Sequence, residues 1–295
     1  MKKVVFTGAG VAIVTPFNDD LSINYDKLGE LIDYQIDNGT DAIIICGTTG
    51  ESATMTEEEH MECIDYAVKR VNKRVPVIAG TGSNDTMTAI ELSKHAEKSG
   101  ADALLIVTPY YNKTTQAGLV YHYKLIAESV NLPIILYNVP GRTGVNILPE
   151  TYLELSKIPN IVATKEANGN ITEIAKTASL CGDNLHIYSG NDDQIVPILA
   201  LGGKGVISVL SNIMPKETHE ICSLFFEGKI NESLKLQLKL FDLIGSLFCE
   251  VNPIPIKAAM ELMGFEVGSL RPPLVDISEK GMARLKESMS KLGLI

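Results

Sequence analysis

Residues 75–108 read VPVIAGTGSNDTMTAIELSKHAEKSGADALLIVT, and this stretch contains one unit of the pattern that decides the fold. Its two ends, 75–79 and 103–108, are short apolar runs rich in β-forming residues, which predict strands. Residues 84–98 between them have the apolar spacing of a helix, and the Ser99-Gly100 pair that follows is typical of a helix end. The stretch therefore predicts a strand, a helix and a second strand in succession.

The same alternation continues in both directions along the chain. Helical patterns are predicted at 25–37, 56–71 and 116–129, and the second begins with Thr56 and Glu59 at the spacing of a capping box. Near-continuous hydrophobicity is expected of parallel strands that are buried on both faces. Eight apolar runs of this kind are predicted as strands, at 11–17, 42–46, 75–79, 103–108, 134–138, 161–164, 186–188 and 206–210.

Eight strand-then-helix units favour the α/β class and a (β/α)8 TIM barrel over residues 1–214. The alternative is a doubly wound open sheet, which would usually carry a glycine-rich nucleotide-binding fingerprint after its first strand. Residues 8–10 (Gly-Ala-Gly) precede the first predicted strand and lack the third glycine, and residues 80–82 also depart from the fingerprint. Residues 215–295 contain helical patterns without strands. We expect them to form a C-terminal helical extension that packs on the barrel and supplies contacts between subunits.

The composition argues against several classes of protein. A formal net charge of −10 disfavours a nucleic-acid partner, because binding a phosphate backbone requires clustered Lys and Arg. The cysteines contain no C-x-x-C pair, so we expect buried thiols in a reducing compartment and no metal site. The first apolar run breaks at Thr7 and Gly8, too early for a signal peptide, and no run reaches the ~20 apolar residues of a membrane span. We therefore expect a cytoplasmic protein without a membrane partner.

Lys165 is the first candidate for catalysis, because active-site residues of such barrels lie at the C-terminal ends of the strands. It ends a buried apolar run, where desolvation of an ammonium group is costly. A lysine must be neutral to attack a carbonyl carbon, and burial favours the neutral form. The alternatives are that the Lys165 side chain extends to solvent or pairs with Glu166.

The loop GTTGE at 47–51 is a second candidate. Its glycines can leave backbone N–H groups free to bind a carboxylate, although a tight turn with threonines bound to local backbone groups is the alternative. Tyr137 ends the fifth run and can transfer protons, and Arg142 can bind a carboxylate with two hydrogen bonds. Each of these two residues, taken alone, is more often a packing or surface residue. No two histidines have metal-site spacing on one helix.

Four motifs occur in order at different strand ends: GTTGES at 47–52, PYYNK at 109–113, YNVPGRTG at 137–144 and TKE at 164–166. With them the chain resembles the pyruvate-dependent Schiff-base aldolases, and among these the dihydrodipicolinate synthase family, over nearly its whole length. The resemblance implies that Lys165 forms an imine with pyruvate. The derived enamine would attack L-aspartate 4-semialdehyde and give 4-hydroxy-tetrahydrodipicolinate, in lysine (diaminopimelate) biosynthesis. No metal and no organic cofactor is implied.

The resemblance also implies roles for other residues. Tyr137, Thr48 and Tyr111 match the family's proton relay, and Tyr111 would reach the site of a neighbouring subunit. A homo-oligomer is therefore implied, as a tetramer built from two dimers, and Arg142 would hold the carboxylate of the semialdehyde. The positions that match substrate-binding residues are Thr49, Arg142, Ile207 and Gly190.

A lysine-effector pocket at the dimer interface is implied as well. Glu57 and Thr88 depart from the lysine-sensitive pattern, which has a histidine and a glutamate at these positions. Since a threonine cannot hold a cationic ligand as a carboxylate can, we predict weak or absent inhibition by lysine. The positions that match the pocket are Ser52, Ala53, His60, Asn84 and Tyr110.

Two other functions stay open. A lyase for a sugar-derived keto acid would share Lys165 and Tyr137, but Thr48 and the Gly141-Arg142 pair favour the synthase. A non-catalytic binding or regulatory protein on the same barrel would be expected to have lost Lys165 or Tyr137, and both are present.

Overall fold

The computed structural model describes residues 2–295, and its centre is a closed barrel of eight parallel strands. The strands follow one another around the barrel in chain order, and β8 pairs with β1 to close it, with Gly205 opposite Gly8. This topology confirms the predicted TIM barrel. The strands are β1 (Gly8–Ala12), β2 (Ala42–Ile45), β3 (Val77–Gly80), β4 (Ala103–Val107), β5 (Ile134–Asn138), β6 (Ile161–Glu166), β7 (His186–Ser189) and β8 (Gly205–Ser208).

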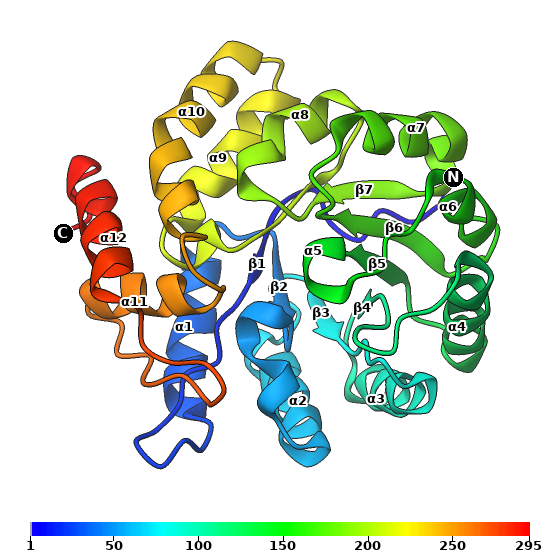
Figure 1. Ribbon diagram of the computed structural model, residues 1–295, viewed down its shortest axis with the longest axis horizontal. Coiled ribbons are helices and arrows are strands. Elements are labelled where there is room, and N and C mark those ends of the chain that lie inside the picture. The colour runs from blue at the N-terminus through cyan, green and yellow to red at the C-terminus, as the bar shows by residue number, and fades with distance from the viewer. Residues whose placement is uncertain (1) are drawn as a thin grey trace.

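Helices surround the strands (Figure 1). The capping box predicted for α2 is present, because the Glu59 backbone N–H donates to Thr56 Oγ1 at 3.2 Å and the Thr56 N–H donates to the Glu59 carboxylate at 3.0 Å. The helices of the barrel layer are α1 (Tyr25–Asp37), α2 (Glu57–Val71), α3 (Thr86–Ser99), α4 (Gln116–Ser129), α5 (Pro140–Thr143), α6 (Pro149–Leu155), α7 (Ile171–Cys181), α8 (Ile195–Ala200) and α9 (Pro215–Phe226).

The first strand begins three residues before the predicted 11–17 and ends five residues before it. Gly8 and Gly10 belong to β1 because they pair with Gly205 and Ile207 of β8. A side chain would not fit at Gly10, where a Cβ would lie 2.6 Å from Ile44 Cδ1 in the barrel interior. The apolar residues after Ala12 are buried for another reason, since the chain there passes beneath the C-terminal segment and the Phe17 N–H donates to the Val267 carbonyl. The hydrophobicity of these residues therefore predicted their burial correctly, but they do not pair as part of the strand.

The last strand was also predicted too long. β8 ends at Ser208, and Leu210–Asn212 form a 3-10 turn instead of continuing the strand as in the predicted 206–210. The buried Asp192 carboxylate accepts hydrogen bonds from the Val209 and Leu210 N–H groups, which occupies the donors that a longer strand would use.

Helices continue after the barrel, on the side that includes α1, α8 and α9 (Figure 1). They are α10 (Ile230–Ser246), α11 (Ile254–Leu262) and α12 (Glu279–Lys291), with α10 packed against α8, α9 and α12. Because α9 packs on β1 and β8 and completes the helical layer, we propose that the extension begins with α10 rather than at residue 215. None of the helices described in 2–295 is both long enough and apolar enough to span a membrane.

Candidate active site

Lys165 and Tyr137 form the centre of the candidate site, inside the barrel. They lie opposite each other on β6 and β5, and Lys165 Nζ is 4.3 Å from the centroid of the Tyr137 ring. Lys165 is 6% exposed, so its side chain does not extend to solvent. Because neighbouring residues of a strand point to opposite faces, Glu166 points away from Lys165, into the layer between strands and helices. Neither alternative for Lys165 therefore describes the structure.

Glu166 instead forms hydrogen bonds that connect the end of β6 to β5 and α6. Its carboxylate accepts hydrogen bonds from the Tyr152 hydroxyl at 2.7 Å, the Asn138 amide at 3.0 Å and the Asn168 backbone N–H at 3.0 Å. Burial raises the pKa of Glu166 to about 7, although these hydrogen bonds oppose the shift. Since Asn138 directly follows Tyr137, the same carboxylate links the strand ends that carry Tyr137 and Lys165.

The loop after β2 contains two short 3-10 turns: Thr48–Gly50, which carries Thr48 and Thr49, and Ser52–Thr54. Glu51 joins the turns in the left-handed conformation, at φ 56° and ψ 31°. Such a conformation is strained for a residue other than glycine and persists only where surrounding contacts hold it. The loop is also attached to the barrel, because Thr15 Oγ1 donates to the Gly50 carbonyl at 2.7 Å.

Asn252, between α10 and α11, connects two of the predicted substrate-binding residues. Its side-chain amide donates to Thr49 Oγ1 at 3.0 Å, and its backbone carbonyl accepts a hydrogen bond from Arg142 Nη2 at 3.0 Å. Arg142 lies in α5 at the mouth of the barrel and is exposed. Thr49 and Arg142 thus both form hydrogen bonds with Asn252, a residue that the sequence did not predict to be part of the site.

A cavity of about 380 Å³ lies beside this group. Thr48 and Arg142 line it, and so do four residues of the predicted effector pocket, Ser52, Ala53, His60 and Tyr110. Its remaining lining includes Glu57 and Thr88, the two positions that depart from the lysine-sensitive pattern.

Two residues of the predicted pocket, His60 and Asn84, have surroundings unlike those of the others. His60 is buried with Nε2 2.7 Å from the Gly80 carbonyl, and burial lowers the pKa of its imidazole. Asn84 does not line the cavity, and its carbonyl accepts a hydrogen bond from the Asn112 amide.

Three other predicted residues lie apart from this cavity. Tyr111 is 91% exposed, on the loop between β4 and α4, in a left-handed conformation with φ 68°. Ile207 is buried in β8, inside the barrel. Gly190 follows β7, and its N–H donates to the Glu166 carbonyl at 2.8 Å; a Cβ at this position would lie 2.8 Å from the Ala167 Cβ.

Residues 2–295 include no group of three His, Cys, Asp or Glu side chains arranged to hold a metal ion. The candidate residues at the site carry amine, hydroxyl, guanidinium and backbone groups. Such groups can form an imine, transfer protons and bind carboxylates.

Comparisons with known proteins agree over nearly the whole chain. The Dihydrodipicolinate synthetase family matches residues 5–292. The 4-hydroxy-tetrahydrodipicolinate synthase of Acetivibrio thermocellus is 61% identical over 295 residues, which is 100% of both chains.

Solved structures give the same result. The crystal structure of dihydrodipicolinate synthase from Thermotoga maritima is 45% identical, with a TM-score of 0.96 over 99% of this chain and 100% of that chain. The dihydrodipicolinate synthase of Cyanidioschyzon merolae, solved with lysine bound, is 41% identical, with a TM-score of 0.96 over 99% of this chain and 100% of that chain.

Proposed function

Since this chain belongs to the dihydrodipicolinate synthetase family, we propose that it condenses pyruvate with L-aspartate 4-semialdehyde to give 4-hydroxy-tetrahydrodipicolinate, in lysine (diaminopimelate) biosynthesis. The observation that carries this proposal is the buried Lys165 amine beside the Tyr137 ring at the open end of the barrel.

The proposed reaction begins when the neutral Lys165 amine attacks the keto carbon of pyruvate and water leaves, which forms the imine. The protonated imine accepts the electron pair of a methyl C–H bond as its proton departs, and an enamine results. The enamine carbon then bonds to the aldehyde carbon of the second substrate. Finally, the amine of that substrate attacks the imine carbon, which closes the ring and releases Lys165.

Protons must move in each of these steps, and hydroxyl groups can carry them. We assign this relay to Tyr137, Thr48 and Tyr111. Tyr137 is the member that contacts Lys165, and Thr48 lies on the loop after β2.

Tyr111 is 91% exposed, and this exposure favours a role outside its own barrel. We propose that it enters the site of a second copy of the chain, and that two such dimers form the tetramer.

Substrate binding is assigned to groups with hydrogen-bond donors. We propose that Thr49 and the backbone at Ile207 bind the pyruvate carboxylate, and that Gly190 contributes backbone contacts. Arg142 would bind the carboxylate of the semialdehyde, since its guanidinium is exposed beside Thr48 at the edge of the cavity.

We further propose that lysine binds weakly, if it binds, in the cavity beside the site. Thr88 supplies no charge there, while Glu57 supplies one carboxylate at the cavity wall. Inhibition well below millimolar lysine would contradict this proposal. If Glu57→Gln then abolished the inhibition, the Glu57 carboxylate would be the group that holds the ligand.

The test of function is an assay with pyruvate and L-aspartate 4-semialdehyde, followed through a coupled nicotinamide-dependent reductase, with Lys165→Ala as the control. Turnover by the wild type that is lost in the control would support both the reaction and the nucleophile. Absence of turnover, with pyruvate still trapped on Lys165 by borohydride, would retain the imine chemistry and favour the lyase for a sugar-derived keto acid.

A further inference from the structure

We infer that Lys257 and Arg271, which follow the barrel, are positioning residues that hold the substrate loop through the Glu51 carboxylate. The substrate loop is here residues 47–55, which carry Thr48 and Thr49. The inference rests on the proposed function for what the loop binds, and on the contacts below for how the loop is held.

Lys257 lies in α11 and forms a fully buried ion pair with Glu51, at 3.1 Å between Nζ and Oε1. The side chains are 2% and 1% exposed. The ammonium group also donates to the carbonyls of Thr15 at 3.2 Å and Ser269 at 2.7 Å, and it lies 4.5 Å from the centroid of the Phe17 ring. All three N–H donors of Lys257 thus have acceptors, which fixes the position of the group.

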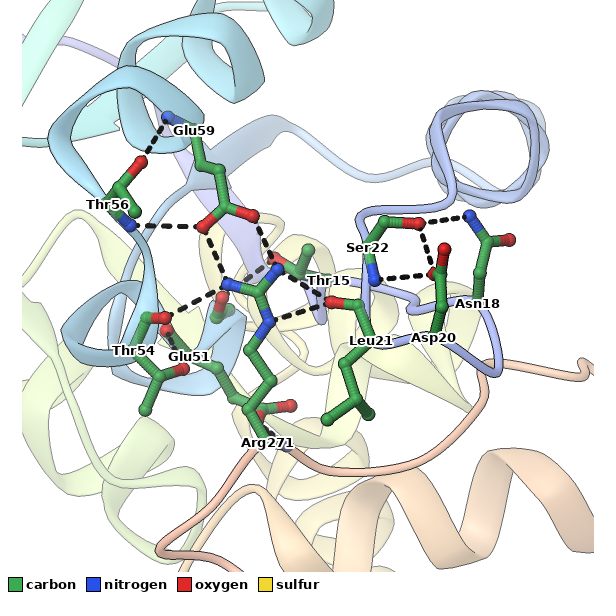
Figure 2. Close-up of polar contacts among 11 residues, drawn as sticks. Thr15, Asn18, Asp20, Leu21, Ser22, Glu51, Thr54, Thr56, Glu59 and Arg271 are labelled. Carbon is green, nitrogen blue, oxygen red and sulfur yellow. Dashed lines mark hydrogen bonds and ion pairs between the residues drawn. The ribbon is translucent and has the colours of Figure 1, made fainter.

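Arg271 completes the environment of Glu51 from the segment between α11 and α12 (Figure 2). Its backbone N–H donates to the second carboxylate oxygen, Glu51 Oε2, at 3.0 Å. Its guanidinium donates to the Thr54 carbonyl at 3.0 Å and to both oxygens of Glu59, at 2.7 and 2.6 Å. Arg271 therefore binds the substrate loop at Glu51 and Thr54, and binds α2 directly behind the loop.

The position of Glu51 determines what these contacts can do. Glu51 is the left-handed residue between the two 3-10 turns, so any change in its backbone angles would reorient the turn that carries Thr48 and Thr49. Three hydrogen bonds from Lys257 and Arg271, together with the Thr15 bond to Gly50, hold the loop from both sides. We conclude that the angles at Glu51 are set by the segment that follows the barrel.

A role in stability alone is a poorer explanation of the pair. A buried ion pair often contributes no more to stability than well-packed apolar side chains of the same size, because both charges lose their hydration. Burial lowers the pKa of Lys257, which reflects this loss, while the Glu51 carboxylate opposes the shift. What the ion pair adds over apolar packing is direction, since its hydrogen bonds fit one arrangement of the loop.

The test separates positioning from stability. We would measure the pyruvate concentration that gives half-maximal borohydride trapping on Lys165, by intact mass, for the wild type, Lys257→Met and Arg271→Ala. The matched control is Met260→Ala, a buried residue of α11 that removes packing from the same helix but leaves the ion pair. Thermal denaturation of each variant gives the loss of stability, and trapping is done well below each transition.

We expect the half-maximal pyruvate concentration to rise about 10-fold or more in Lys257→Met and Arg271→Ala, because small displacements of binding groups have large effects. Met260→Ala should stay within about 2-fold of the wild type at a comparable loss of Tm. A change of less than about 2-fold in the folded variants would refute the positioning role. If Lys257→Met does not fold, Arg271→Ala decides the question. Absence of trapping in the wild type would refute the proposed function and this inference with it.

Discussion

Replacement of Glu166 by glutamine should alter how the stability of this protein depends on pH. Burial raises the pKa of Glu166 from 4.5 to about 7 in the folded chain, so folding favours the protonated acid. The resulting stabilisation is complete below about pH 4.5 and is lost as the pH rises through about 7. In Glu166→Gln the side chain keeps its shape and an acceptor oxygen but cannot titrate.

The size of the effect follows from the two pKa values. One pKa unit corresponds to about 1.36 kcal/mol. The difference between 4.5 and about 7 therefore corresponds to roughly 3 kcal/mol of folding free energy. Most of this folding free energy is lost between pH 5 and pH 8. We expect the free energy of unfolding of the wild type to fall by roughly 2–3 kcal/mol relative to that of Glu166→Gln.

Urea unfolding of both proteins at pH 5, 6, 7 and 8 would measure this difference. The protein concentration must be the same throughout, because association of subunits stabilises the folded state. Other titrating groups are common to both proteins and cancel in the comparison. Two parallel pH profiles, within about 0.5 kcal/mol, would refute the argument that burial of Glu166 disfavours its charged form.

Three further outcomes are expected. Arg142→Ala should raise the KM for the semialdehyde about 10-fold or more, while pyruvate trapping on Lys165 is unchanged, because the guanidinium would bind only the second substrate; loss of trapping would refute this division of roles. Mixed subunits of the inactive variants Tyr111→Phe and Lys165→Ala should recover about a quarter of wild-type activity, because half of the random dimers would hold one intact site; no recovery would mean that Tyr111 does not act across subunits. Gly80→Ala should lower the free energy of unfolding in urea by roughly 1–3 kcal/mol, since the new Cβ would lie 2.3 Å from the Cys46 carbonyl, and wild-type stability would contradict this.

Local sequence patterns were sufficient for most of the barrel. The helix at 116–129 begins and ends where its apolar spacing predicts. Thr56 is the N-cap of α2, as its capping-box spacing predicts. The first strand was misplaced because Gly8 and Gly10 resemble a turn, although neither has room for a side chain. A Cβ would meet the Asp41 carboxylate at Gly8 and Ile44 in the barrel interior at Gly10. Strand pairing depends on neighbours in space, which the spacing of apolar residues does not report.

The candidate site was predictable only in part, for a related reason. Lys165 and Tyr137 could be selected because each ends a strand, and the barrel rule places strand ends together. Asn252 and Lys257 could not be selected, because they contact Thr49 and Glu51 from 203 and 206 positions away. No local signal distinguishes them from other polar residues of the helical extension.

Lys257 and Arg271 follow the barrel in the sequence, so the ribosome makes them after all eight strands. On a ribosome, β8 is complete at Ser208, long before Lys257 and Arg271 have been made. At that point in synthesis all eight strands have been made, while Glu51 still lacks its partners. We therefore expect the substrate loop to become ordered only after the later segment has emerged and docked against Glu51.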